Sequence, residues 1–76
     1  MNKERRKEIE ALIDELDDLK ARIESVQSDE QDYFDNMPEN LQSSERGEMA
    51  EEAIGNLDSA LDSLDEAIDS LRETMQ

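Results

Sequence analysis

Carboxylates dominate the side chains of this sequence that could do chemistry, because 23 of its 76 residues are Asp or Glu and none is His or Cys. Without His and Cys the chain lacks the usual base for a hydroxyl nucleophile, a thiolate nucleophile, and the ligands of zinc and most iron sites. Most carboxylates fall at positions expected to face solvent, where no environment is evident that would make one an acid and another a base. The sequence therefore predicts a protein that is not an enzyme and has no cofactor.

The spacing of the carboxylates also argues against a dedicated metal site. The four-carboxylate di-iron bundle needs a Glu-x-x-His motif, which this chain does not contain. Asp29, Asp32 and Asp35 are three residues apart, but their segment lacks the central Gly of a calcium-binding loop. We expect no metal site beyond weak cation binding at the surface.

The net charge of −15 limits the classes of partner. A nucleic-acid-binding protein needs a basic surface to neutralise phosphates, so we expect no direct nucleic-acid binding and no attraction to anionic membrane. A protein with a basic surface would be attracted. No apolar run is long enough to span a membrane, and no apolar stretch follows the basic cluster Lys3, Arg5, Arg6 and Lys7, so we expect a cytoplasmic protein.

Four aspartates form an acidic stripe on the second half of the chain. They are spaced i, i+4, i+7 and i+11, which places them on one face of a helix: Asp58, Asp62, Asp65 and Asp69. Their spacing along the helix axis, about 4.5–6 Å, approaches the roughly 3.4 Å per charge of one DNA strand. The stripe is interpreted either as a hydrated surface, the usual meaning of such charge, or as a mimic of nucleic-acid phosphates.

The segment from residue 29 to residue 42 holds both aromatic residues and the only Pro. Its apolar members are Tyr33, Phe34, Met37 and Leu41. They are expected to seal the end of a helical hairpin, which is the favoured interpretation, or to form an apolar anchor that binds a partner. Neighbouring residues on a helix point about 100° apart, so one aromatic ring could seal the turn while the other is presented.

The first half of the chain predicts a long helix over about residues 2–36, where Gly and Pro are absent. Its apolar residues alternate three and four apart, as in a coiled-coil seam. Ile13 widens this seam, Glu30 interrupts it and Tyr33 continues it, and a helix break near Ser28 is left open. The predicted seam is Ile9, Leu12, Leu16, Leu19, Ile23 and Val26.

Pro38 predicts a turn over about residues 37–43, and a second helix follows over about residues 44–75. Ser43 or Ser44 is expected to cap that helix, and its two Gly residues are weak points. The second helix carries an apolar seam flanked by a row of Ala, which would let another helix approach closely. We expect these residues to mediate self-association: Ala53, Ile54, Leu57, Ala60, Leu61, Leu64, Ala67, Ile68 and Leu71.

These elements predict an all-α protein with one domain over residues 1–76, an antiparallel two-helix hairpin that resembles a coiled coil. The basic cluster near the N-terminus would then lie beside four acidic residues, Asp65, Glu66, Asp69 and Glu73. A hairpin leaves one side of its seam in water. We therefore expect a homodimer that forms a four-helix bundle, or else a core completed by a different protein.

Residues 29–54, DEQDYFDNMPENLQSSERGEMAEEAI, resemble a segment of short acidic proteins encoded in bacterial prophages and other mobile elements. The resemblance implies a helical hairpin in the bacterial cytoplasm, but it supplies no functional residues. It also raises the hypothesis of an inhibitor of a host nucleic-acid-binding protein.

The sequence thus favours a non-catalytic acidic interaction module that self-associates and binds a host or element-encoded protein. The alternative is a nucleic-acid-mimicking inhibitor, of the anti-defence type, that blocks a basic cleft. A scaffold that binds only itself is a third interpretation.

Overall fold

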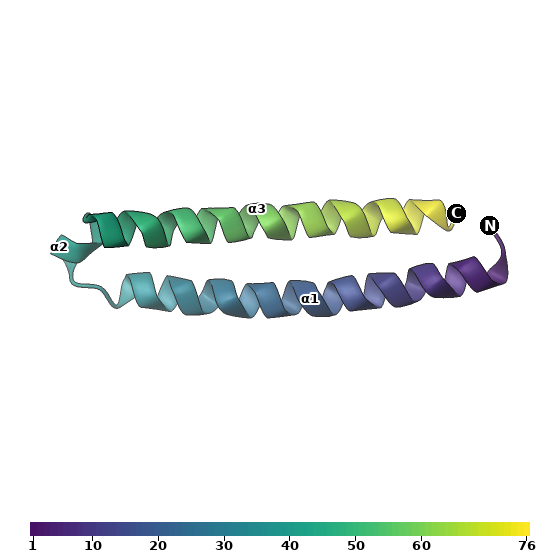
Figure 1. Cartoon of the computed structure of the whole chain (residues 1–76), viewed down its shortest axis with the longest axis horizontal. Helices are drawn as coiled ribbons and strands as arrows, with labels where there is room; N and C mark the ends of the chain where they lie inside the picture. The colour runs from purple at the N-terminus through teal and green to yellow at the C-terminus, as the bar shows by residue number, and fades with distance from the viewer.

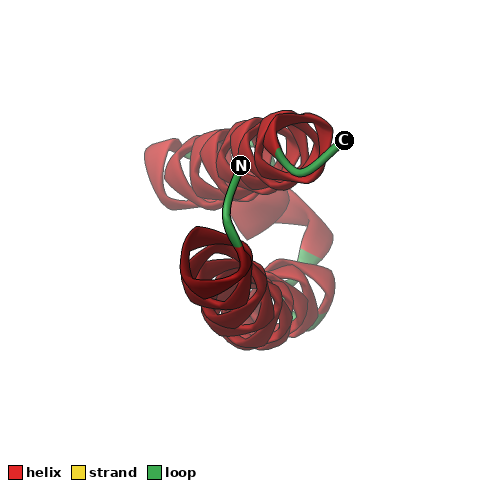
Figure 2. Ribbon diagram, turned by 90° about the vertical axis from the view of Figure 1, so that its right-hand side faces the viewer, coloured by secondary structure: helices red, strands yellow, loops and turns green.

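The computed structural model describes all 76 residues, and its two long helices form an antiparallel hairpin (Figure 1). Helix α1 spans Lys3–Asp35, the short helix α2 spans Glu39–Gln42 and helix α3 spans Glu45–Thr74. The molecule is a rod of 58 × 15 × 12 Å. The predicted all-α hairpin is confirmed. Viewed along the rod, α1 and α3 lie side by side and no other element covers their two broad sides (Figure 2).

Local sequence explains the limits of α1. The side chain of Asn2 accepts a hydrogen bond of 2.8 Å from the backbone N–H of Arg5, which caps the first turn. With no Gly or Pro to interrupt it, the helix runs unbroken through Ser28 and ends before Pro38. The possible break near Ser28 therefore does not occur.

The turn contains a short helix that the sequence did not predict. The backbone N–H groups of Leu41 and Gln42 both donate to the carbonyl oxygen of Pro38, forming the single turn of α2. The side-chain amide of Gln42 donates to the carbonyl oxygens of Phe34, in the last turn of α1, and Met37, which follows the helix. The turn is thereby tied to the first helix.

Ser44 occupies the N-cap position of α3, as expected for one of the two candidate serines. Its hydroxyl donates to the carbonyl oxygen of Leu41 and makes no side-chain capping bond to α3. The serine thus links α2 to α3 and leaves the positive end of α3 to the nearby acids Glu45 and Glu48.

Helix α3 presents its predicted apolar seam to α1. Ala50 and Ile68 are buried in this seam, and the residues between and beyond them are half-buried at intervals of three and four: Ile54, Leu57, Leu61, Leu64, Leu71 and Met75. The core is thin, because only three hydrophobic residues of the whole chain are buried, the third being Ile13.

Helix α1 uses a different seam from the predicted one. The side chains it buries or half-buries toward α3 are Ile9, Ile13, Leu16, Lys20, Ile23, Gln27, Glu30 and Phe34. The prediction that Leu12, Leu19 and Val26 would face the second helix is wrong, since these side chains are 43–56% exposed. The predicted and observed seams share Ile9, Leu16 and Ile23. A single neighbouring helix covers only one flank of this shared row, and α3 covers the flank opposite Leu12, Leu19 and Val26.

The two glycines of α3 are predicted to respond in opposite ways to substitution by Ala. A Cβ atom at Gly47 would lie 2.0 Å from the carbonyl oxygen of Gln42, whereas a Cβ at Gly55 would meet nothing within 4 Å. We expect Gly55→Ala to raise the free energy of unfolding by about 1 kcal/mol through helix propensity. Gly47→Ala should lower it by about 1–3 kcal/mol, because the turn must open to admit the methyl group. Urea unfolding followed by circular dichroism measures both, and stabilisation by Gly47→Ala would contradict the close approach of α2 and α3.

Candidate interaction surfaces

The exposed apolar residues of α1 repeat every seven residues and form one stripe. We call this set the α1 stripe, and it consists of Leu12, Leu19, Val26 and Tyr33, which are 47%, 43%, 56% and 48% exposed. Residues seven apart return to the same face of a helix that packs in coiled-coil fashion. The stripe therefore runs along one side of the rod over 22 residues, or about 32 Å.

The Ala row of α3 lies on the same broad side as the α1 stripe. Near the turn, an open groove of about 570 Å³ is lined from α1 by Glu30 and Tyr33 and from α3 by residues that include Met49 and Ala53. Ala60 and Ala67 follow Ala53 at heptad intervals and are exposed. The apolar side of the hairpin is thus made by the α1 stripe together with this row.

From Met49 to Ser70, the part of α3 that faces this side carries no charge, whereas Glu45 and Arg46 line the groove before Met49. The exposed and half-buried side chains of this part are uncharged, although 41% of the chain is charged. We call the whole set the uncharged row of α3: Met49, Ala53, Asn56, Ala60, Ser63, Ala67 and Ser70. An uncharged strip 22 residues long is an unusual surface for a protein with a net charge of −15.

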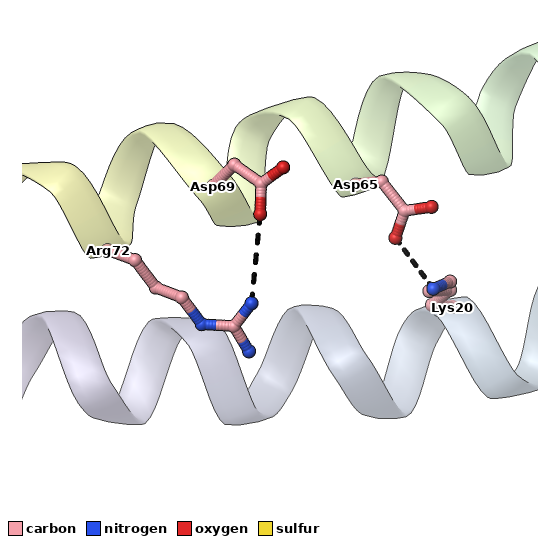
Figure 3. A network of polar contacts seen from close by, with 4 residues as sticks. All are labelled: Lys20, Asp65, Asp69 and Arg72. Atoms are coloured by element: carbon pink, nitrogen blue, oxygen red, sulfur yellow. Dashed lines mark ion pairs between the residues drawn. The ribbon is translucent and has the colours of Figure 1, made fainter.

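The opposite broad side is polar and joins the two helices by hydrogen bonds. The side-chain amide of Gln27 donates to the carbonyl oxygen of Ile54 at 3.2 Å and to a carboxylate oxygen of Asp58. The ammonium group of Lys20 lies 2.6 Å from Asp65 (Figure 3). These contacts cross from α1 to α3, so they set the level and the rotation at which the helices meet.

The structure separates the four aspartates of the predicted acidic stripe into two roles. Asp58 and Asp65 flank the helix seam and contact α1, while Asp62 and Asp69 lie further from it. Asp69 also lies 3.7 Å from Arg72 on its own helix (Figure 3). Three of the four carboxylates are therefore engaged by side chains of the same chain. The sequence analysis did not identify Gln27 and Lys20 as the partners of Asp58 and Asp65. Their positions directly beside the predicted apolar seam of the first helix could have indicated such contacts.

The apolar residues near the turn divide between inside and outside. Phe34 and Met37 are half-buried against the hairpin end, whereas Tyr33 and Leu41 are exposed. Tyr33 belongs to the α1 stripe and lines the groove beside Met49. The structure therefore places Phe34 in the seal of the turn and Tyr33 on the apolar side.

The basic cluster does not pair with the acids that the sequence suggested. The structure contains two ion pairs, and neither includes Lys3, Arg5, Arg6 or Lys7. Gln27 is level with Asn56, midway between its contacts Ile54 and Asp58. Twenty residues earlier, Lys7 is level with Gln76, past the end of α3. The expected pairing is wrong because this register leaves the cluster at the tip of the rod, while Lys20 takes Asp65.

No three metal-ligating side chains come together in this structure. None of its helices has the length and apolar character that crossing a membrane requires. Comparisons with protein-family models, with curated proteins and with solved structures find no match to this chain.

The ion pair between α1 and α3 predicts a pH dependence at the alkaline end. The hydrogen bond to Asp65 is the main cause that raises the pKa of Lys20 above its ordinary value of 10.5, although burial partly opposes it and the charges of Asp65, Glu24 and Asp17 add to it. A raised pKa in the folded state means that the contribution of Lys20 to stability is complete below pH 10.5 and is lost as the pH rises above that value.

Thermal unfolding of the native chain should therefore move to lower temperature more steeply above pH 10.5 than that of Lys20→Met, which keeps the aliphatic stem but has no charge. The variant also serves as the control for the titration of other basic residues. Equal pH profiles for the two proteins would show that the Lys20–Asp65 contact contributes nothing to stability.

Proposed function

We propose that this chain is a non-catalytic protein-interaction module that self-associates and binds a further protein through the exposed sides of its helical hairpin. The α1 stripe is the observation that supports this proposal. Four large apolar side chains at strict heptad spacing are left outside the only helix seam that the chain makes by itself. Such spacing is the pattern by which one helix packs on another.

The surface area of the chain supports the same proposal. A folded protein of 8.7 kDa is expected to expose about 4,700 Å². This chain exposes 5757 Å², about 1,000 Å² more. A stable protein–protein interface of ordinary size covers about 800 Å² on each partner. Covering one broad side of the rod would therefore return the exposed area to the ordinary range.

The energetics favour covering the apolar side. Each large apolar side chain that moves from exposed to fully buried contributes about 1.5–3 kcal/mol, and those of the α1 stripe are already about half covered. A chain with only three buried hydrophobic residues is expected to have a small free energy of unfolding. A helical partner on the apolar side would add the missing core.

The alternative proposal, a phosphate-mimicking inhibitor that occupies a basic cleft, rests on the polar side. Asp58 lines a groove there with Glu24 and Asp32. The engagement of Asp58, Asp65 and Asp69 by neighbouring side chains leaves Asp62 as the one free carboxylate of the stripe, which favours the interaction module. Binding by a mimic should weaken steeply as salt rises, whereas binding by the apolar side should tolerate salt. A bacterial, cytoplasmic setting and an origin in a mobile element stay predictions.

Substitution within the α1 stripe tests self-association. We expect Leu19→Asp to raise the dissociation constant of the self-associated form by on the order of 100-fold or more, because each dimer loses the apolar contacts of two leucines and would bury two carboxylates in their place. Light scattering at low and high salt measures the mass, and circular dichroism checks that the hairpin stays helical. Ala21→Asp, at an exposed position outside the stripe, is the matched control and should leave the mass unchanged.

Two outcomes would contradict the proposal that the apolar side mediates self-association. One is a native chain that is monomeric at concentrations of tens of micromolar and above. The other is an equal loss of mass in Leu19→Asp and Ala21→Asp, which would mean that added charge alone disrupts the assembly.

A further inference from the structure

We propose that the partner on the apolar side is a second copy of this chain in antiparallel order, so that the turn of one hairpin lies beside the basic tip of the other. This inference rests on the self-association proposed above and adds its geometry. The two-fold axis would run across the apolar side, from the midpoint of the α1 stripe to Ala60 on α3.

The two rows of the apolar side share one centre, which is the condition for such an axis. The α1 stripe is centred halfway between Leu19 and Val26, and the Ala row is centred on Ala60. Gln27 is level with Asn56, because it contacts Ile54 and Asp58 on either side of that residue. Four to five residues back along α1, the centre of the stripe is therefore level with Ala60 or Leu61. One rotation of 180° superimposes both rows on themselves.

The side chains that this rotation brings together are compatible in size. On α1, Leu19 meets Val26 of the second copy and Leu12 meets Tyr33, which places large apolar groups against each other. On α3, Ala60 meets Ala60 and Ala53 meets Ala67, so the two α3 helices can approach closely. The uncharged row of α3 leaves no carboxylates facing one another across this contact.

Charge selects the antiparallel order over the parallel one. Residues 29–48 at the turn end contain seven acidic residues and one basic residue, Arg46. The other tip carries the basic cluster, which has no ion-pair partner in its own chain. Antiparallel order places that cluster beside the acidic turn of the second copy, whereas parallel order places two acidic turns side by side.

One member of the basic cluster lies directly on the path of the stripe. Arg5 precedes Leu12 by one heptad, so in the antiparallel dimer it extends beyond Tyr33 of the second copy toward its turn. The groove at that end is rimmed by Glu30, Glu45 and Arg46, which together carry one net negative charge. The site at each end of the dimer is therefore built from both copies: an apolar floor and this charged rim from one, and Leu12 and Arg5 from the other.

Disulfide crosslinking tests this geometry, because the chain has no Cys and each introduced thiol is unique. The Cα atoms of a disulfide lie 4.4–6.8 Å apart. On the proposed axis Ala60 meets itself, whereas two copies of Ala53, or two of Ala67, lie about 21 Å apart along the helices. Ala60→Cys should form a covalent dimer under mild oxidation at least tenfold faster than Ala53→Cys or Ala67→Cys alone. An equimolar mixture of the latter two variants should crosslink at about half the initial rate of Ala60→Cys, because random pairing places the two different thiols against each other in about half of its dimers.

Ala21→Cys, on the outer face, gives the rate of random collision. A native chain that is dimeric by light scattering, with Ala60→Cys no faster than Ala21→Cys, would overturn the antiparallel order and leave self-association standing. In a parallel dimer α3 faces α1 of the other copy. Rapid crosslinking in a mixture of Ala60→Cys and Val26→Cys would therefore identify the parallel order and overturn the antiparallel one. A monomeric chain would overturn both the geometry and the self-association on which it rests.

Discussion

Gln27 reaches from the first helix to the second and holds the two at one level and one rotation. Its amide donates hydrogen bonds to the carbonyl oxygen of Ile54 and the carboxylate of Asp58. One heptad earlier, Lys20 also contacts α3 through its ion pair with Asp65. A buried or half-buried polar group in an apolar seam is satisfied in few arrangements, so it specifies register more than it adds stability. Every other feature of the surface follows from that choice of rotation.

The rotation decides what the hairpin presents to other molecules. With Lys20 and Gln27 toward α3, the α1 stripe is turned outward, beside a row of α3 that carries no charge. The aspartates fall on the opposite flank, where Asp65 and Asp69 pair with basic side chains and Asp58 accepts a hydrogen bond from Gln27. A rod that is strongly acidic on average thus has one side whose carboxylates are confined to the groove near the turn, at Glu30 and Glu45.

Sequence periodicity was sufficient to predict the all-α hairpin, because Pro38 divides two long heptad patterns of nearly equal length. It could not select the seam of α1, since Ile9, Leu16 and Ile23 belong to both candidate seams and Leu12 is more apolar than Lys20. The correct flank depends on hydrogen bonds to α3 that exist only after the helices meet. The position of the basic cluster was predicted wrongly for a related reason: the contacts of Gln27 with Ile54 and Asp58 set the register, which places Lys7 level with Gln76.

Small-angle X-ray scattering tests the central claim, that a second copy covers the apolar side, because it reports mass and length together. We expect twice the 8.7 kDa of the chain, with a maximum dimension that stays close to the 58 Å of one hairpin, since two rods that overlap side by side add width and little length. A mass of one chain, or a doubled mass with a length approaching two rods end to end, would contradict it.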